Sequence, residues 1–158
     1  MKSNDSVTRI VWEGNVYLWD SNILRAYLKG HPTVTEHTRR ATGKRIALPS
    51  IVVAEALRGR CDHLLKAPPE QVAMAEKLMQ ETIQTVQGFH QVSFDDASKV
   101  AMQQMLKQHQ SKGRYADLMI AALAKAGQHT VVTRNTKDFA DLLPKQQLQN
   151  WIDDLPVS

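Results

Sequence analysis

Short strand-like runs alternate with helical patterns along this chain, and this alternation constrains the fold more than any other feature. A strand signal is followed by a helical pattern again and again. The expected strands are 16–19, 45–49, 89–94 and 129–134, and the expected helices are 21–30, 50–59, 69–87, 96–110, 115–127 and 136–143. Strands separated by helices predict an α/β fold, a three-layer α/β/α sandwich with a central parallel sheet.

Residues that favour helix ends set the expected boundaries. Ser21 or Asn22 is available to cap the first helix and Ser50 the second, because short polar side chains accept hydrogen bonds from free N–H groups. Gly59 is expected to end the second helix, since glycine is common just after a helix C-terminus.

Length and cysteine content bound the domain organisation. The 158 residues fit one domain, expected over 16–158, and residues 1–15 form an N-terminal extension that could add a strand through the run VTRIVW. The lone Cys61 excludes an internal disulfide, and no apolar run approaches the roughly 20 residues needed to cross a bilayer. We therefore expect a cytoplasmic protein with no membrane segment.

Charge indicates a polyanionic partner without requiring one. Twenty Lys and Arg oppose sixteen Asp and Glu, and basic residues gather at 37–45 and 112–114. Such clusters suit a nucleic acid, although Lys and Arg also coat ordinary protein surfaces.

Four acidic residues lie at the ends of apolar segments or inside them. Asp20 follows VYLW, Glu55 lies within SIVVAEALRG, Asp117 lies near the start of YADLMIAALA, and Asp138 follows VVTR in VVTRNTKDF. Functional groups collect beyond the carboxyl ends of parallel strands, so these acids are expected to meet at one edge of the sheet. Two carboxylates about 5 Å apart repel by roughly 3 kcal/mol at an effective dielectric near 20. Protonation or a hard divalent cation, Mg²⁺ or Mn²⁺, must compensate, and the cation is the preferred interpretation.

These four segments together resemble the signature segments of PIN-domain nucleases, in the same order and with similar spacing. The VapC toxins of type II toxin–antitoxin systems are especially similar, including the closing LQNW, and the resemblance covers about residues 16–152. It implies a compact α/β/α domain that holds Mg²⁺ or Mn²⁺, cleaves RNA, forms a homodimer and is restrained by a cognate antitoxin. The fifteen residues before the first strand are longer than is usual in these small toxins.

The resemblance assigns roles residue by residue. Asp20, Glu55 and Asp117 become the core metal ligands and catalytic acids, with Asp138 as the fourth. Asn22, Thr133 and Asn135 are predicted to support the acids, although they also suit helix caps, strand-end hydroxyls or turns. Arg114 and Arg134 are predicted to contact RNA phosphates, although pairing with neighbouring acids explains them equally well.

The predicted function is therefore a metal-dependent endoribonuclease, the toxin of a toxin–antitoxin pair. An apolar groove for the antitoxin is expected near 24–28 and 51–57. A non-catalytic RNA- or protein-binding module that keeps the acidic pocket is the alternative. A phosphoaspartate phosphatase is disfavoured, because its pattern requires a second Asp where this chain has Asn22.

Overall fold

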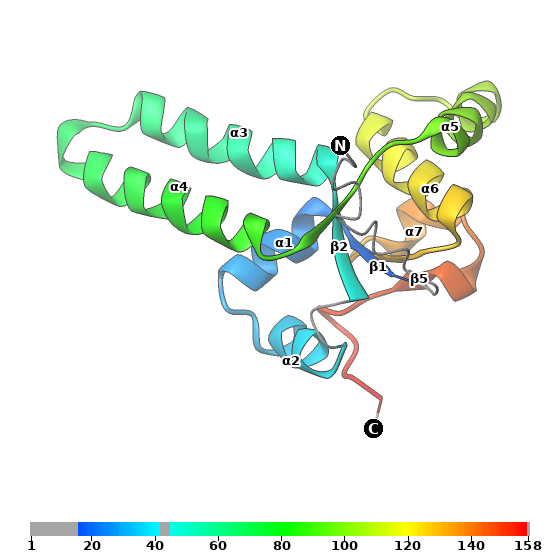
Figure 1. Cartoon of the computed structure of the whole chain (residues 1–158), viewed down its shortest axis with the longest axis horizontal. Helices are drawn as coiled ribbons and strands as arrows, with labels where there is room; N and C mark the ends of the chain where they lie inside the picture. The colour runs from blue at the N-terminus through cyan, green and yellow to red at the C-terminus, as the bar shows by residue number, and fades with distance from the viewer. Residues whose placement is uncertain (1–15, 42–44, 158) are drawn as a thin grey trace, which may run out of the picture.

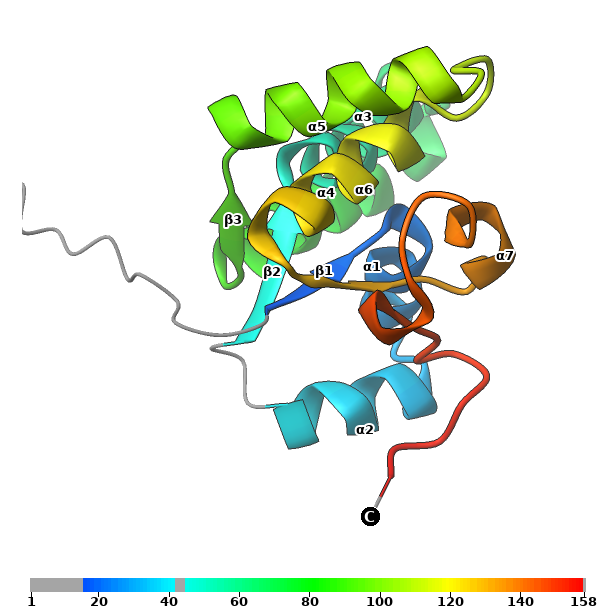
Figure 2. The ribbon, with the colours of Figure 1, turned by 90° about the vertical axis from the view of Figure 1, so that its right-hand side faces the viewer.

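A computed structural model describes residues 16–41 and 45–157 and confirms the three-layer α/β/α fold with a central parallel sheet (Figures 1 and 2). In chain order the elements are β1 (Tyr17–Trp19), α1 (Ser21–Leu28), α2 (Pro32–Ala41), β2 (Ile46–Pro49), α3 (Ser50–Lys66), the 3-10 turn η2 (Pro69–Gln71), α4 (Val72–Gln87), β3 (His90–Val92), α5 (Asp96–Gln108), α6 (Tyr115–Gly127), β4 (Thr130–Val132), α7 (Thr136–Phe139), the 3-10 turn η3 (Lys145–Gln147) and β5 (Leu148–Gln149). Among these described helices, none has the length and apolar character needed to span a bilayer.

In the described part of the chain, five strands pair in the order β3-β2-β1-β4-β5, and every pairing is parallel. In this register Leu18 lies opposite Ala47 of β2 and Val131 of β4. The chain builds the sheet outward from β1 through β2 to β3, and then continues on the other side of β1 with β4 and β5. The strand order therefore reverses between β1 and β4, which is where ligand sites form in open parallel sheets.

Helices cover the sheet from both sides. In Figure 1, α3 and α4 form an antiparallel hairpin that extends to the left, while α5 and α6 pack against each other on the right. Apolar strand residues such as Leu18, Ile46 and Val131 have no exposed surface, and α6 contributes Leu118 and Ile120 to the same core. This two-sided burial explains why the strand segments are apolar without alternation.

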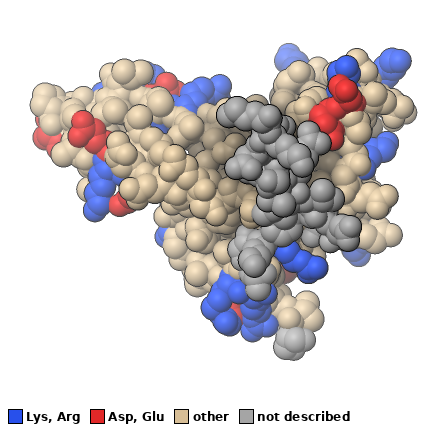
Figure 3. Space-filling view, viewed as in Figure 1, with Lys and Arg blue, Asp and Glu red and all other residues tan. Residues whose placement is uncertain are grey.

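Lys and Arg gather at the lower end of the molecule, over α2 (Figures 1 and 3). The sequence pattern indicated only a basic cluster in this region, and the helix was not predicted. Within it Arg39 and Arg40 both pair with Glu36, at 2.6 and 3.0 Å. Part of the basic charge is therefore balanced locally.

Several helix boundaries differ from the predictions, and the expected helix at 136–143 is reduced to α7, Thr136–Phe139. The prediction that Gly59 ends a helix is wrong, because α3 continues to Lys66 while packing against α4. Neither Ser21 nor Asn22 caps α1, because Asp20 is the N-cap. Ser50 is likewise the first residue of α3 and not its cap.

The strands are also shorter than expected, and one was missed. The expected strand at 129–134 is reduced to β4, and the two-residue strand β5 was not predicted. The strand suggested for VTRIVW lies in residues 1–15, outside the described part of the chain.

Candidate active site

Asp20 lies at the switch point of the sheet. It directly follows β1, and its backbone N–H donates to the carbonyl of Val132 in β4 at 3.1 Å. Its carboxylate accepts a hydrogen bond from the backbone N–H of Ile23 at 3.1 Å, which caps α1. Only 6% of its surface is exposed. The sequence folds this way because an Asp at an N-cap satisfies one of the free N–H groups of the helix.

Burial raises the pKa of Asp20, and three groups oppose that rise. The Thr133 side chain and the backbone N–H groups of Ile23 and Asn22 donate hydrogen bonds that stabilise the charged carboxylate, while the charge of Glu55 disfavours it. The pKa remains above its usual range, so the negative charge of Asp20 is only partly compensated by the groups around it.

Glu55 reaches the same edge of the sheet from the second turn of α3. Its carboxylate accepts a hydrogen bond from the Ser21 hydroxyl at 3.0 Å, and its side chain is half-buried. Ser21 directly follows Asp20, so one short segment holds one acid and orients a second. The sequence indicated Ser21 only as a possible helix cap, and nothing in its local pattern revealed this contact.

Asp117 lies in the first turn of α6, and its pKa is raised to about 6. Burial is the largest cause, followed by the negative charges of Asp20 and Asp138, with Glu55 adding a smaller effect. The positive charge of Arg114 works in the opposite direction. The structure thus places all four predicted acids close enough to act on one another electrostatically.

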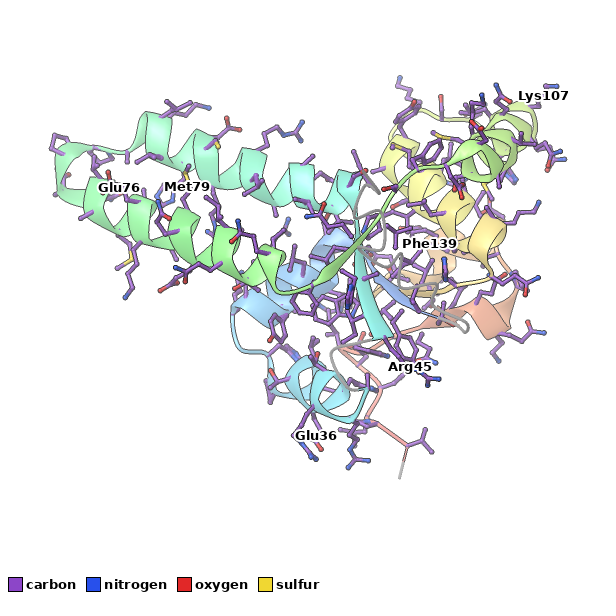
Figure 4. All side chains as sticks on the ribbon, viewed as in Figure 1. Glu36, Arg45, Glu76, Met79, Lys107 and Phe139 are labelled. Atoms are coloured by element: carbon purple, nitrogen blue, oxygen red, sulfur yellow. The ribbon has the colours of Figure 1, made fainter. Side chains whose placement is uncertain are left out.

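Asp138 occupies the rim of this group and is exposed. It lies in the short helix α7. The residue after it, Phe139, is buried and anchors this helix beside the core (Figure 4). Arg114, the N-cap residue of α6, binds this element. Its guanidinium donates to the Asp138 carbonyl oxygen at 2.7 Å and forms a bidentate pair with Asp141 at 2.9 and 3.1 Å. Asp141 has a structural role that the sequence did not reveal.

The predicted supporting residues are close to these acids but differ in environment. Thr133 is fully buried, and its hydroxyl accepts a hydrogen bond from the Asn135 backbone N–H at 3.0 Å while bonding to Asp20. Asn135 is exposed and makes no side-chain cap to α7. Arg134 forms an exposed pair with Asp153 at 3.4 Å. RNA contact by Arg114 or Arg134 stays a prediction.

The chemical type of the four carboxylates suits a hard divalent cation, because Mg²⁺ and Mn²⁺ prefer oxygen ligands. Within residues 16–41 and 45–157, no ion pair neutralises any of these carboxylates. However, no three His, Cys, Asp or Glu side chains of the described chain converge closely enough to hold a metal ion as they stand. Asp20 and Glu55 are instead directed toward Ile23 and Ser21, so cation binding would require the carboxylates to turn toward one another.

Comparison with protein families places most of the chain in a known family. The family model described as the PIN domain matches residues 17–142. A search of curated proteins gave no match.

Solved structures with the same fold cover almost the whole chain. VapBC2 from Rickettsia felis, solved bound to a DNA fragment from the VapBC2 promoter, has a TM-score of 0.69 and 25% sequence identity. The match covers 86% of this chain and 98% of the matched chain. DNA-bound VapBC from Salmonella typhimurium has a TM-score of 0.70 and 20% identity over 87% and 99%. A toxin–antitoxin complex from Klebsiella pneumoniae has a TM-score of 0.63 and 21% identity over 85% and 97%.

Proposed function

Because this chain belongs to the PIN-domain family, we propose that it is a metal-dependent endoribonuclease and the toxin of a toxin–antitoxin pair. One observation carries the nuclease part of the proposal. Four carboxylates from four different elements interact electrostatically at the switch point of the sheet, and the pKa of Asp117 is raised to about 6 as a result of burial and this repulsion. Arg114 lowers the pKa of Asp117 only in part, and a carboxylate cluster whose repulsion is incompletely balanced is suited to a cation.

In this proposal Asp20, Glu55, Asp117 and Asp138 hold Mg²⁺ or Mn²⁺. Such an ion supplies Lewis-acid chemistry when bound, activating water and neutralising charge on the phosphodiester. The residues around the acids orient them. The hydroxyl of Thr133 donates a hydrogen bond that favours the ionised form of Asp20, and the hydroxyl of Ser21 positions Glu55.

The ionisation of Asp117 sets a pH limit on this chemistry. Its carboxyl group retains a proton below about pH 6 in the metal-free protein. A protonated carboxylic acid is a poor ligand for a cation, so metal affinity is expected to fall as the pH drops through that value.

A cognate antitoxin is the proposed partner. The similar structures include a toxin–antitoxin complex, and α1 and α3 border a cavity of about 500 Å³ that is lined in part by Leu24, Leu28 and Ala56. These residues fall in the groove predicted from sequence. The rest of the lining is mostly polar or charged, including Arg58 and Asp62, so the cavity suits a partner helix that offers both apolar and charged side chains. We also propose a homodimer, and a monomer in sedimentation equilibrium would contradict that part.

The test of catalysis uses a panel of structured RNAs incubated with Mn²⁺, Mg²⁺ or EDTA. Asp20→Asn and Asp117→Asn should each abolish cleavage while the circular dichroism spectrum stays native. Asp96→Asn is the matched control, because Asp96 is exposed on α5 and its one ion pair among the described residues is with Lys99 at 3.7 Å. Cleavage that survives both site substitutions would refute the assignment of these acids.

A non-catalytic RNA- or protein-binding module is the second candidate. One observation favours it: among the described residues, no three potential ligands are already arranged to hold a metal ion. This function predicts a folded protein that binds RNA with equal affinity in Mn²⁺ and in EDTA and cuts none of the panel.

A further inference from the structure

Two cavities flank α1, and the same two cations line both of them. The first, of about 500 Å³, includes Ser21 and Glu55 of the acid site. The second, of about 580 Å³, includes Asn22, two residues after Asp20, and Arg134, which directly follows Thr133. Arg25 and Lys29 border both cavities. The outer surface of α1 therefore forms a ridge that begins at the acid site and carries two positive charges.

Arg25 and Lys29 project from one side of the helix, because residues four apart are neighbours on a helix surface. Both are exposed, and within the described residues neither forms an ion pair. They contrast with Arg39 and Arg40, which share Glu36. At 1.5 Å per residue, Arg25 and Lys29 lie roughly 7 and 13 Å along the helix axis from Asp20.

The second cavity adds further positive and polar groups. Arg134 holds Asp153 only loosely, with 3.4 Å between guanidinium nitrogen and carboxylate oxygen. The buried Nδ1 of His31 has no hydrogen-bond partner in the described part of the molecule. Asp153 is the carboxylate in this lining, so Arg25, Lys29 and Arg134 outnumber it. The surroundings therefore suit a ligand with several negative charges.

We propose that Arg25 and Lys29, assisted by Arg134, bind backbone phosphates of the RNA strand next to the cleavage position. This inference rests on the proposed function, because these cations would bind the RNA substrate of the same acid site. A site made of carboxylates repels RNA, and cations displaced along α1 attract flanking phosphates without neutralising the acids themselves. A structural explanation competes: cations near a helix C-terminus interact favourably with the helix dipole.

The test compares Arg25→Gln/Lys29→Gln with the control Lys66→Gln/Lys77→Gln. Both variants lose two exposed cations. Lys66 ends α3, and Lys77 follows Glu76, which Figure 4 places near the far end of the α3–α4 hairpin. Binding of a short fluorescein-labelled single-stranded RNA is measured by fluorescence anisotropy in EDTA over a range of salt concentrations. Cleavage of the same RNA is then measured in Mn²⁺.

The ridge variant should bind RNA about tenfold more weakly than wild type. Its dependence of log affinity on log salt should become shallower by about 0.7 for each phosphate that the variant no longer binds. In Mn²⁺ its KM should rise while kcat is retained, and the control should match wild type in every measurement. A dipole effect alone would change unfolding and leave RNA affinity and salt dependence unaltered, which would overturn the proposal.

The two proposals fail separately. If wild type cleaves RNA and the ridge variant matches it in affinity and KM, the ridge assignment is wrong and the nuclease proposal stands. If wild type binds RNA through Arg25 and Lys29 and cuts none, the ridge stands and the nuclease proposal falls.

Discussion

Asp117 is a residue whose charge destabilises the fold that holds it. Its pKa is about 6 in the metal-free protein and near 3.8 in an unfolded chain. The folded state therefore binds more protons between these values, and stability falls as the pH rises from about 4 to 6. Above pH 6 the full destabilisation is present. This is expected where function, and not stability, selects the side chain.

We predict that Asp117→Asn stabilises the metal-free protein at neutral pH. The difference between about 6 and 3.8 corresponds to at most about 3 kcal/mol. Partial exposure and loss of a favourable interaction with the α6 dipole reduce the expected gain to about 1–2 kcal/mol. Urea unfolding in EDTA measures it, and the gain should vanish near pH 4. A variant less stable than wild type at pH 7.5 would contradict the raised pKa.

Thr133 supports the same site through its hydroxyl group. It bonds to the Asp20 carboxylate and accepts the Asn135 N–H at 3.0 Å, all within a fully buried environment. We predict that Thr133→Val costs about 1–3 kcal/mol, because it leaves buried polar groups unpaired. It should also raise the pKa of Asp20 further. Thr133→Ser keeps the hydroxyl, so urea unfolding should show a smaller loss of stability than for Thr133→Val, even though serine is smaller than threonine. Equal losses of stability in the two variants would assign Thr133 to packing alone.

At the scale of an element, α3 contains an interior glycine that does not end it. A Cβ added at Gly59 meets no described atom within 4 Å, so alanine fits there without strain. We predict that Gly59→Ala stabilises the protein by about 0.5–1 kcal/mol, since glycine loses more chain entropy than alanine on entering a helix. Thermal unfolding measures the change. Gly127→Ala provides the contrast, because its Cβ would overlap the His129 ring and should destabilise.

Sequence patterns were sufficient to predict the layers of the fold but not the ends of its helices. Alternating strands and helices predicted the layers correctly, because two-sided burial leaves apolar runs that are visible in the sequence. Helix ends were less predictable. Gly59 remains helical because contacts with α4 outweigh a local preference of about 1 kcal/mol. Asp20 became the cap of α1 in place of Ser21, since both side chains have that capacity and only the turn after β1 decides between them.

At the scale of the whole molecule, the acid site is a consequence of topology. The carboxyl ends of β1 and β4 adjoin at the switch point, and α3 and α6 bring Glu55 and Asp117 to the same region. Parallel pairing made this convergence predictable from the order of segments. The contacts Ser21–Glu55 and Arg114–Asp141 were not predictable, because they join residues 34 and 27 positions apart with no periodic signal.

A cation at this edge would join four elements of the fold, and its binding should appear as global stability. We predict that Mn²⁺ raises the Tm of wild type, with a stabilisation of about 2.7 kcal/mol at roughly 100 times its Kd. No three of the described carboxylates converge as ligands in the metal-free protein, so reorienting their side chains toward the cation reduces the net free energy of binding. Asp20→Asn should lose most of the Mn²⁺ response, while exposed Asp96→Asn should keep it. An equal rise in Tm for Asp20→Asn would place the cation elsewhere and remove the electrostatic basis for a metal-dependent nuclease at this site.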